Sequence, residues 1–249
     1  MIFDWLPESL NLASFFFLVG VSYLTSAITA ALGIGGGITL LAIMANLLPI
    51  PAVIPVHGVV QLGSNLGRLS LLRRHVETRL LLWFALGSLL GSVLGGYLAV
   101  NLSGQWLRIA MGAFILYSAW LPAVKLASGR RALVGIATVT SFAGMVVGGV
   151  APFIFAVIKD WFDDRKALVG TLAAMVSLQQ GLKMLLFGFL GFTFTPWLVL
   201  IALMIATGYL GTLTGRIFLE RAPARVVQPI LKVVLTAMGL RLLYLGIWG

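Results

Sequence analysis

Two clusters of glycine interrupt long apolar stretches of this sequence, and they constrain its fold more than any other feature. The first, at residues 31–38, reads Ala-Leu-Gly-Ile-Gly-Gly-Gly-Ile, and the second, at residues 144–152, reads Gly-Met-Val-Val-Gly-Gly-Val-Ala-Pro. Each glycine inside a helix costs roughly 1 kcal/mol relative to alanine, so both clusters predict a broken helix. Lipid cannot satisfy the freed backbone groups, so a break at membrane depth must be buried in protein or line a polar cavity.

The composition indicates an integral membrane protein. Of the 249 residues, 60% are hydrophobic and 10% are charged, which leaves too little polar surface to cover a soluble globule. A spanning helix needs about 20 apolar residues, so the length predicts roughly eight to ten membrane segments. We therefore expect a single transmembrane domain over residues 1–249 and no soluble domain.

The basic residues stand in short clusters between the apolar runs. The formal net charge is +10, but this clustering is typical of cytoplasmic loops under the positive-inside rule, so we expect no nucleic-acid partner. The chain has no cysteine, which excludes disulfides and thiolate metal or redox chemistry.

The apolar runs predict ten helical segments in two sets of five. They are 11–32, 38–48, 53–72, 80–100 and 106–124 in the first half, and 132–147, 150–158, 167–190, 197–215 and 226–247 in the second. Eleven residues of helix rise about 16 Å, half of the hydrocarbon thickness, so 38–48 and 150–158 cannot span alone. Each is predicted to be one arm of a hairpin hinged at a glycine break. Whether 11–32 spans fully stays open.

The two halves register as an internal repeat, with about 11–125 matching about 132–248. The charges of the loops swap between the halves. The basic loop at 73–79 corresponds to the uncharged turn at 191–196, and the uncharged turn at 101–105 corresponds to the basic loop that holds Arg216, Arg221 and Arg225. This swap predicts an all-α protein of two inverted repeats, each with a glycine-hinged hairpin plus three spanning helices. The alternative is eight spans in two parallel sets of four.

The third segment carries an unusual polar face. His57, Gln61, Asn65 and Arg68 fall, together with Ser64, within an arc of about 100° of a helix. A cation at the bilayer centre costs at least roughly 3 kcal/mol, so such residues usually face a cavity or a partner. For Arg68 the alternative is that the side chain reaches the headgroups.

The second half repeats part of this pattern. Gln180 and Lys183 stand 115 positions after Asn65 and Arg68 (180 − 65, 183 − 68). The two cations are therefore predicted to occupy equivalent places in the two halves.

The tips of the two hairpins are expected to meet near the midplane and to form an anion site. The free N–H groups and partial positive charge of helix N-termini attract anions. The glycines expected at these tips are Gly35, Gly36, Gly37, Gly148 and Gly149. The alternative is that they only allow helices to pack, which is the role predicted for the ladders of Gly87, Gly91, Gly95, Gly211 and Gly215.

Acidic residues are confined to the N-terminus and the loops. Metal-ion and cation transporters commonly need buried carboxylates, so an anion suits this chain better. We find no His/Glu/Asp cluster with metal spacing and no nucleophile with a paired base inside a span. We therefore expect no catalytic residue, no metal and no cofactor.

These motifs resemble the sulfite exporter TauE/SafE family of membrane permeases. The resemblance rests on the Gly-Ile-Gly-Gly-Gly break, the proline-rich turn after it, the polar run from His57 to Arg68, and the second Gly-Gly break followed by Gln179-Gln180. It is looser in the second half, where Val169 is placed at the position of His57. The resemblance implies export or uptake of small sulfur-containing anions such as sulfite, thiosulfate or organosulfonates, driven by an ion gradient, in the cytoplasmic membrane.

The sequence thus predicts a secondary transporter that works by alternating access around a midplane anion site. The expected substrate-binding residues are Gly35, Gly36, Gly37, His57, Gln61, Asn65, Arg68, Gly148, Gly149, Gln180 and Lys183. The expected partners are a small anion and the lipid bilayer, with a homodimer as an open option. The alternatives are a channel-like or non-transporting assembly component and, in a third class, an intramembrane enzyme.

Overall fold

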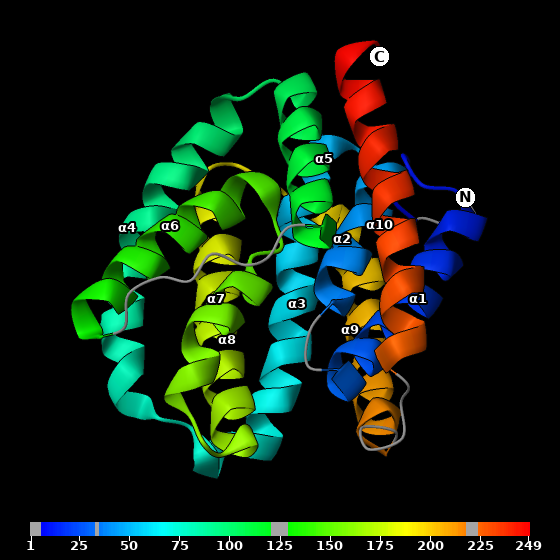
Figure 1. Ribbon diagram of the computed structural model, residues 1–249. Coiled ribbons are helices and arrows are strands. Elements are labelled where there is room, and N and C mark those ends of the chain that lie inside the picture. The colour runs from blue at the N-terminus through cyan, green and yellow to red at the C-terminus, as the bar shows by residue number, and fades with distance from the viewer. Residues whose placement is uncertain (1–5, 33–34, 121–128, 218–223) are drawn as a thin grey trace.

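The structure is a computed structural model that describes residues 6–32, 35–120, 129–217 and 224–249 (Figure 1). Within these ranges the chain forms ten α-helices and no strand. The helices of the first half are α1 (Leu12–Leu32), α2 (Gly36–Leu47), α3 (Ile50–Leu72), α4 (Thr78–Asn101) and α5 (Gly104–Trp120). Those of the second half are α6 (Arg130–Val147), α7 (Ala151–Ile158), α8 (Arg165–Phe189), α9 (Leu198–Ile217) and α10 (Ala224–Ile247).

Each predicted segment corresponds to one helix, which confirms the all-α polytopic fold class. Five stretches are long and apolar enough to cross a membrane, and they fall on α1, α4, α8, α9 and α10. The 21-residue α1 is among them, so by length and composition the first arm can span. The arms α2 and α7, with 12 and 8 residues, are too short to cross alone. The predicted end of the fifth segment, 121–124, lies outside the described residues, as does Arg221.

The first break separates α1 from α2, but its position differs from the prediction. The helix α1 ends at Leu32, and Gly36 and Gly37 are the first two residues of α2; of the residues between the two helices, Gly35 is described, and 33 and 34 lie outside the described residues. Gly35 caps α2 with φ 105°, a conformation that side-chain-bearing residues rarely adopt. Gly36 is needed for a different reason: a Cβ there would overlap the backbone oxygen of Thr25 in α1. The hairpin can close this tightly only with glycine at that position.

The second break follows the same plan. The helix α6 ends at Val147, Gly148 caps it with φ 92°, and α7 begins at Ala151. Pro152 stands at the second position of α7, where it fits because the first N–H groups of a helix have no partner within it. Both predicted breaks are therefore present.

The glycine ladders are packing faces, as predicted. A Cβ at Gly91 would overlap the backbone oxygen of Thr138 in α6, and a Cβ at Gly211 would overlap that of Tyr23 in α1. The successive contacts advance in the same direction on both helices, so α4 lies parallel to α6, and α9 lies parallel to α1. These close approaches are typical of small-residue packing between membrane helices.

The remaining two pairs of helices run antiparallel. On α3, Gly58 lies against Lys183 of α8, while Leu72, near the other end of α3, lies against Gly170. The helices α5 and α10 likewise pack against each other through Gly112 and Gly239. Each of these pairs joins the same numbered element of the two halves.

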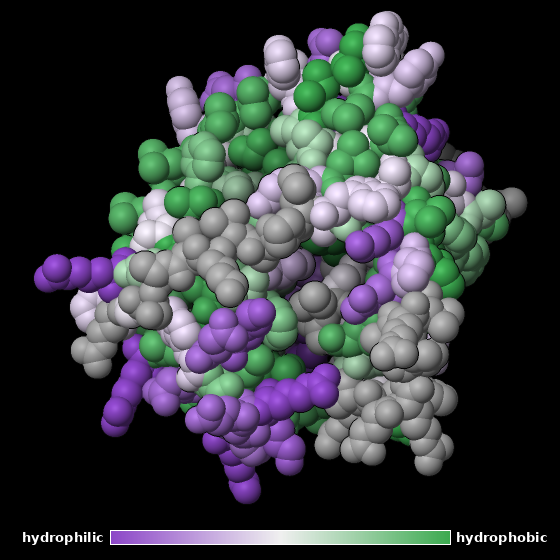
Figure 2. All heavy atoms as spheres, viewed as in Figure 1, coloured by the Kyte–Doolittle hydropathy of each residue, from purple (hydrophilic) through white to green (hydrophobic). Residues whose placement is uncertain are grey.

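Charged loops gather at one end of the molecule. The loops that join α3 to α4 and α7 to α8 lie at the lower end in Figure 1, opposite the turn between α4 and α5. Figure 2 shows hydrophilic side chains clustered at this lower end, below a predominantly hydrophobic body. The exposed basic side chains there include Arg73, Arg74, Arg165 and Lys166. We call this the basic end.

Candidate functional site

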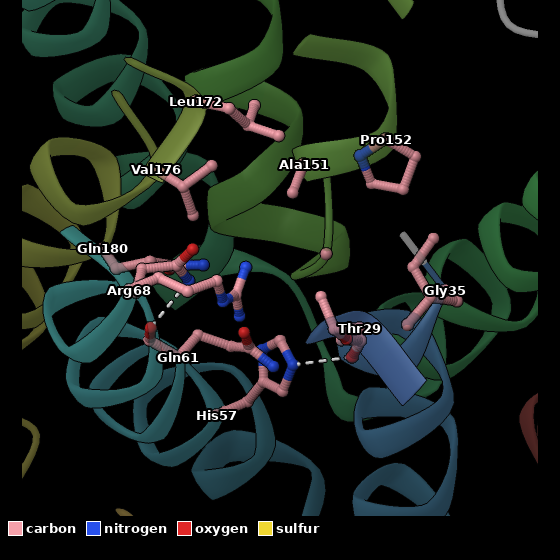
Figure 3. A pocket seen from close by; sticks show the side chains of 14 residues that line it. Thr29, Gly35, His57, Gln61, Arg68, Ala151, Pro152, Leu172, Val176 and Gln180 are labelled. Carbon is pink, nitrogen blue, oxygen red and sulfur yellow. Dashed lines mark hydrogen bonds between the residues drawn. The ribbon is translucent and has the colours of Figure 1, made fainter. Parts of the chain in front are cut away.

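A cavity with polar and apolar walls lies between the two helix breaks (Figure 3). It is lined by Thr29, Gly35, Gly37 and Ile38 at the first break, by His57, Gln61, Asn65 and Arg68 on α3, by Gly149, Ala151 and Pro152 at the second break, and by Leu172, Val176 and Gln180 on α8. Its volume is about 40 Å³, and one water needs roughly 10–15 Å³ on the same measure. The cavity can therefore hold a few waters or one small oxyanion. We call it the central cavity.

Eight of the eleven predicted site residues line the central cavity, and three do not. Gly36 faces Thr25 and Thr29 of α1. Gly148 accepts a hydrogen bond at its backbone oxygen from Nζ of Lys183, at 3.0 Å. Lys183 itself lines a separate, smaller cavity.

His57 connects α3 to the tip of α2. Its Nε2 lies 2.9 Å from the backbone oxygen of Gly37, and a carbonyl can only accept, so Nε2 carries the proton. The imidazole is fully buried, and its Nδ1 has no hydrogen-bond partner among the described residues. This bond holds the hinge tip on α3, so His57 positions the cavity wall as well as lining it.

Two amides lie one turn apart on α3 beside this tip. A Cβ at Gly37 would come within 3.2 Å of Nε2 of Gln61, so the glycine allows the amide to lie close against the tip. Asn65 donates one Nδ2 hydrogen to the backbone oxygen of Gln61, at 2.8 Å. Among the described residues, its second Nδ2 hydrogen and its side-chain oxygen make no hydrogen bond.

Arg68 brings a positive charge into the central cavity. Its Nη2 donates to Oγ of Ser64 at 3.2 Å, and its buried Nε has no partner. No ion pair joins this guanidinium to a carboxylate in the part of the chain that the structure describes. The side chain is half-buried and lines the cavity. Figure 3 shows the guanidinium pointing toward the space that Ala151 and Val176 close from the other side.

The smaller cavity lies beside Lys183 and is almost closed. It has a volume of about 10 Å³, room for one water. Its lining residues are Ser92, Ser141, Gly144, Met145, Val150, Gln179, Gln180 and Lys183. Of the residues that the structure describes, Gln180 alone lines both cavities. The two predicted cations are thus separated, Arg68 in the central cavity and Lys183 in this second cavity.

The two faces of the central cavity differ in polarity. The helices α3 and α8 begin at Ile50 and Arg165, an offset of 115 positions (165 − 50). At this offset Leu172, and not Val169, is the counterpart of His57, and Val176 is the counterpart of Gln61. The polar wall comes from α3 and the facing wall is largely apolar.

Sequence reasoning missed the apolar half of the lining. Leu172 and Val176 could have been found from the same offset that paired Asn65 with Gln180. Ala151 and Pro152 follow directly after the second glycine cluster, which is itself a signal. Thr29 donates to the backbone oxygen of Thr25 in its own helix at 2.9 Å, and it also lines the cavity.

The chemistry of the central cavity suits a negatively charged guest. Besides His57 and the hydroxyl of Thr29, its polar lining consists of amides, a guanidinium and the N-termini of two short helices, each of which can donate hydrogen bonds. The described residues contain no group of three or more His, Cys, Asp or Glu that could hold a metal ion. A polytopic helical membrane protein with a ligand-sized cavity between two broken helices has the design of a membrane transporter.

The comparison with known families agrees with this class. The chain belongs to the sulfite exporter TauE/SafE family, whose sequence profile matches residues 17–242. This is a family of membrane transporters, and the resemblance noted from the sequence is confirmed. No curated protein and no solved structure shows a significant match to the chain.

Proposed function

We propose that this protein is a secondary transporter that carries sulfite or a similarly small sulfur-containing anion across the cytoplasmic membrane. One observation supports this above all: Arg68 lies in the central cavity with a single hydroxyl partner and no counter-ion among the described residues. A half-buried cation without a carboxylate partner is energetically unfavourable unless an anion binds to it. Family membership supplies the chemical class of that anion.

The substrate would be held by hydrogen-bond donors from α3. Arg68 has free N–H groups directed into the cavity, and Asn65 and Gln61 add amide donors one turn and two turns away. The first turns of α2 and α7 add backbone N–H groups, although Pro152 removes one donor from α7. The positive charge of Arg68 would repel a cation.

The cavity size favours sulfite and thiosulfate over larger sulfonates. A volume of about 40 Å³ fits a few water-sized groups, which is enough for a tetrahedral or pyramidal oxyanion. We therefore expect thiosulfate to compete with sulfite and an aromatic sulfonate to compete poorly.

Alternating access would come from two inverted repeats. Support for the repeat comes from the antiparallel packing of α3 on α8 and of α5 on α10, because an inverted repeat requires equivalent elements to run in opposite directions. Two other helix pairs give further support. The helix α1 packs against α9, and α6 packs against α4, so in each pair the first helix of one half contacts the fourth helix of the other half. With the basic end in the cytoplasm, the Arg68 end of the central cavity faces inward.

Transport is tested with purified protein in proteoliposomes and radiolabelled sulfite, under anaerobic conditions that prevent oxidation to sulfate. We expect saturable uptake that is accelerated by unlabelled sulfite on the opposite side of the membrane. A channel would give flux without this acceleration, and a non-transporting component would give none, so either result would refute the proposal.

A further inference from the structure

The second cavity is built from the counterparts of residues that line the first. At the offset of 115 positions, Gly144 corresponds to Thr29, Val150 to Gly35, Gln180 to Asn65 and Lys183 to Arg68. Half of the residues around the second cavity are therefore equivalents of the lining of the central cavity. This correspondence involves the lining residues alone and does not depend on the identity of the substrate.

Hydrogen bonds between helices close the second cavity. Gln179 on α8 donates to Oγ1 of Thr140 at 3.0 Å and to Oγ of Ser141 at 2.7 Å, both on α6. Lys183 donates to the backbone oxygen of Gly148 at the end of α6. Together these bonds tie α8 to α6, and we call them the latch.

The equivalent positions around the central cavity carry no latch. Ser64 is the counterpart of Gln179, and it accepts a bond from Arg68 on its own helix. Among the described residues, neither the Ser64 nor the Arg68 side chain makes a hydrogen bond to α1, the counterpart of α6. The residues around the second cavity are buried, whereas Gln61 and Arg68 at the central cavity are half-buried, and the bonds to α6 are a further difference between the two cavities.

The two cavities adjoin at Gln180, and the second lies farther from the basic end than Arg68 does. Arg68 is close to the end of α3 at the basic end, whereas Ser92 and Lys183 lie in the second halves of α4 and α8, which run away from the basic end (Figure 1). An anion that leaves the central cavity toward the far side would meet Gln180 and then Lys183. Gln180 is placed for such a hand-over because it lines both cavities, and the N–H groups of its side-chain amide are the donors that an anion would meet there.

We propose that the second cavity is a second anion-binding station, which opens toward the end opposite the basic loops when the latch of Gln179 and Lys183 releases α6. In the open state Nζ of Lys183 leaves the backbone oxygen of Gly148 and binds the anion, as Arg68 does in the central cavity. The hydroxyls of Ser92 and Ser141 add two donors. This inference rests on the proposed transport function.

Single cysteines test the opening directly, because the chain has no cysteine of its own. Thr29→Cys reports the central cavity and Ser92→Cys the second cavity. Ser88→Cys is the matched control, since Ser88 lies one turn before Ser92, is fully buried and lines neither cavity. Each variant is treated with a charged, membrane-impermeant thiol reagent from one side of oriented vesicles, in buffer free of sulfite, because sulfite attacks such reagents.

We expect Thr29→Cys to react from the basic side, Ser92→Cys to react more slowly from the opposite side, and Ser88→Cys to stay unlabelled. Adding Gln179→Ala should raise the labelling rate of Ser92→Cys severalfold and lower that of Thr29→Cys. If Ser92→Cys in a transporting protein stays unlabelled, or reacts only from the basic side, the second station does not exist.

The anion-binding role of Lys183 is tested by the sidedness of transport. Lys183→Gln should raise the sulfite concentration for half-maximal transport about tenfold or more from the side opposite the basic loops and leave the basic side within twofold, with Lys183→Arg restoring most of the loss. Equal effects on both sides, or none, would overturn the assignment. Failure of the unmodified protein to transport sulfite would instead refute the proposed function, while the thiol labelling would still report the two openings.

Discussion

Replacement of Arg68 by glutamine is the most direct test of the central cavity. The guanidinium has five N–H donors, and the described residues engage one of them, through Oγ of Ser64 at 3.2 Å. Its buried Nε is unpartnered. Arg68→Gln removes the charge and most donors while it keeps a side chain that can still reach Ser64.

The expected loss follows from the kind of bond that is removed. A hydrogen bond to a charged group contributes about 1.5–3 kcal/mol, which corresponds to a roughly 10- to 150-fold weaker affinity for the anion. Pure Coulomb attraction at about 4 Å could reach about 4 kcal/mol at an effective dielectric constant near 20, but Arg68 is half-exposed to the cavity, so solvent screening lowers that value. Arg68→Lys keeps the charge and loses the planar guanidinium, so the affinity of this variant for the anion should lie between those of the unmodified protein and Arg68→Gln.

Stability should move differently from affinity. Arg68 makes one side-chain bond, to its own helix, and its charge has no counter-ion in the described chain. Its removal should leave the melting temperature in detergent unchanged or slightly higher. Sulfite binding and proteoliposome uptake are measured beside Arg73→Gln, which changes an exposed basic side chain outside the cavity. If folded Arg68→Gln binds sulfite as tightly as Arg73→Gln does, the assignment of Arg68 as an anion ligand is wrong.

Three further substitutions test the framework around the site. Gly91→Ala places a Cβ on the backbone of α6 and should destabilise the protein by about 1–3 kcal/mol, seen as a lower melting temperature than for Gly104→Ala, where nothing lies within 4 Å. Gly35→Ala forces a side chain into φ 105°, which should cost about 1–3 kcal/mol of stability and should slow transport. In the control Gly20→Ala the new Cβ meets no neighbour, so neither stability nor the transport rate should change. His57→Phe removes the bond to the tip of α2 and should reduce sulfite affinity; unchanged affinity would show that the tip is held by other contacts.

The breaks and helices were predictable because their causes are local. Dense glycine clusters break helices whatever surrounds them, and apolar runs of about 20 residues form membrane helices. The polar face of α3 was predictable for the same reason, because helical periodicity alone brings Gln61, Asn65 and Arg68 to one side.

Contacts distant in sequence decided the features that the sequence did not reveal. The placement of Lys183 outside the central cavity depends on Gly148, and the closure of the second cavity depends on bonds from Gln179 to Thr140 and Ser141. Nothing in the local pattern around Lys183 indicates that its ammonium would bind a backbone oxygen 35 positions away in sequence. The position of Gly36 inside α2 likewise follows from its contact with Thr25 of α1.

The less apolar long helices of this chain are also the more buried ones, and they line the site. Among the five stretches apolar enough to span, the one in α8 is the least apolar and the most buried, with 56% of its apolar stretch buried, while the one in α10 has 22% buried. The 23-residue α3 is long enough to span but does not reach the apolar level of these five, and it packs against α2, α8 and α9. Because protein rather than lipid surrounds α3, its polar side chains are not exposed to hydrocarbon. Only a helix enclosed by other helices can hold an amide and a cation at membrane depth. In a transporter of this kind, a long helix that is less apolar than the other spanning helices is therefore the first candidate for the substrate site.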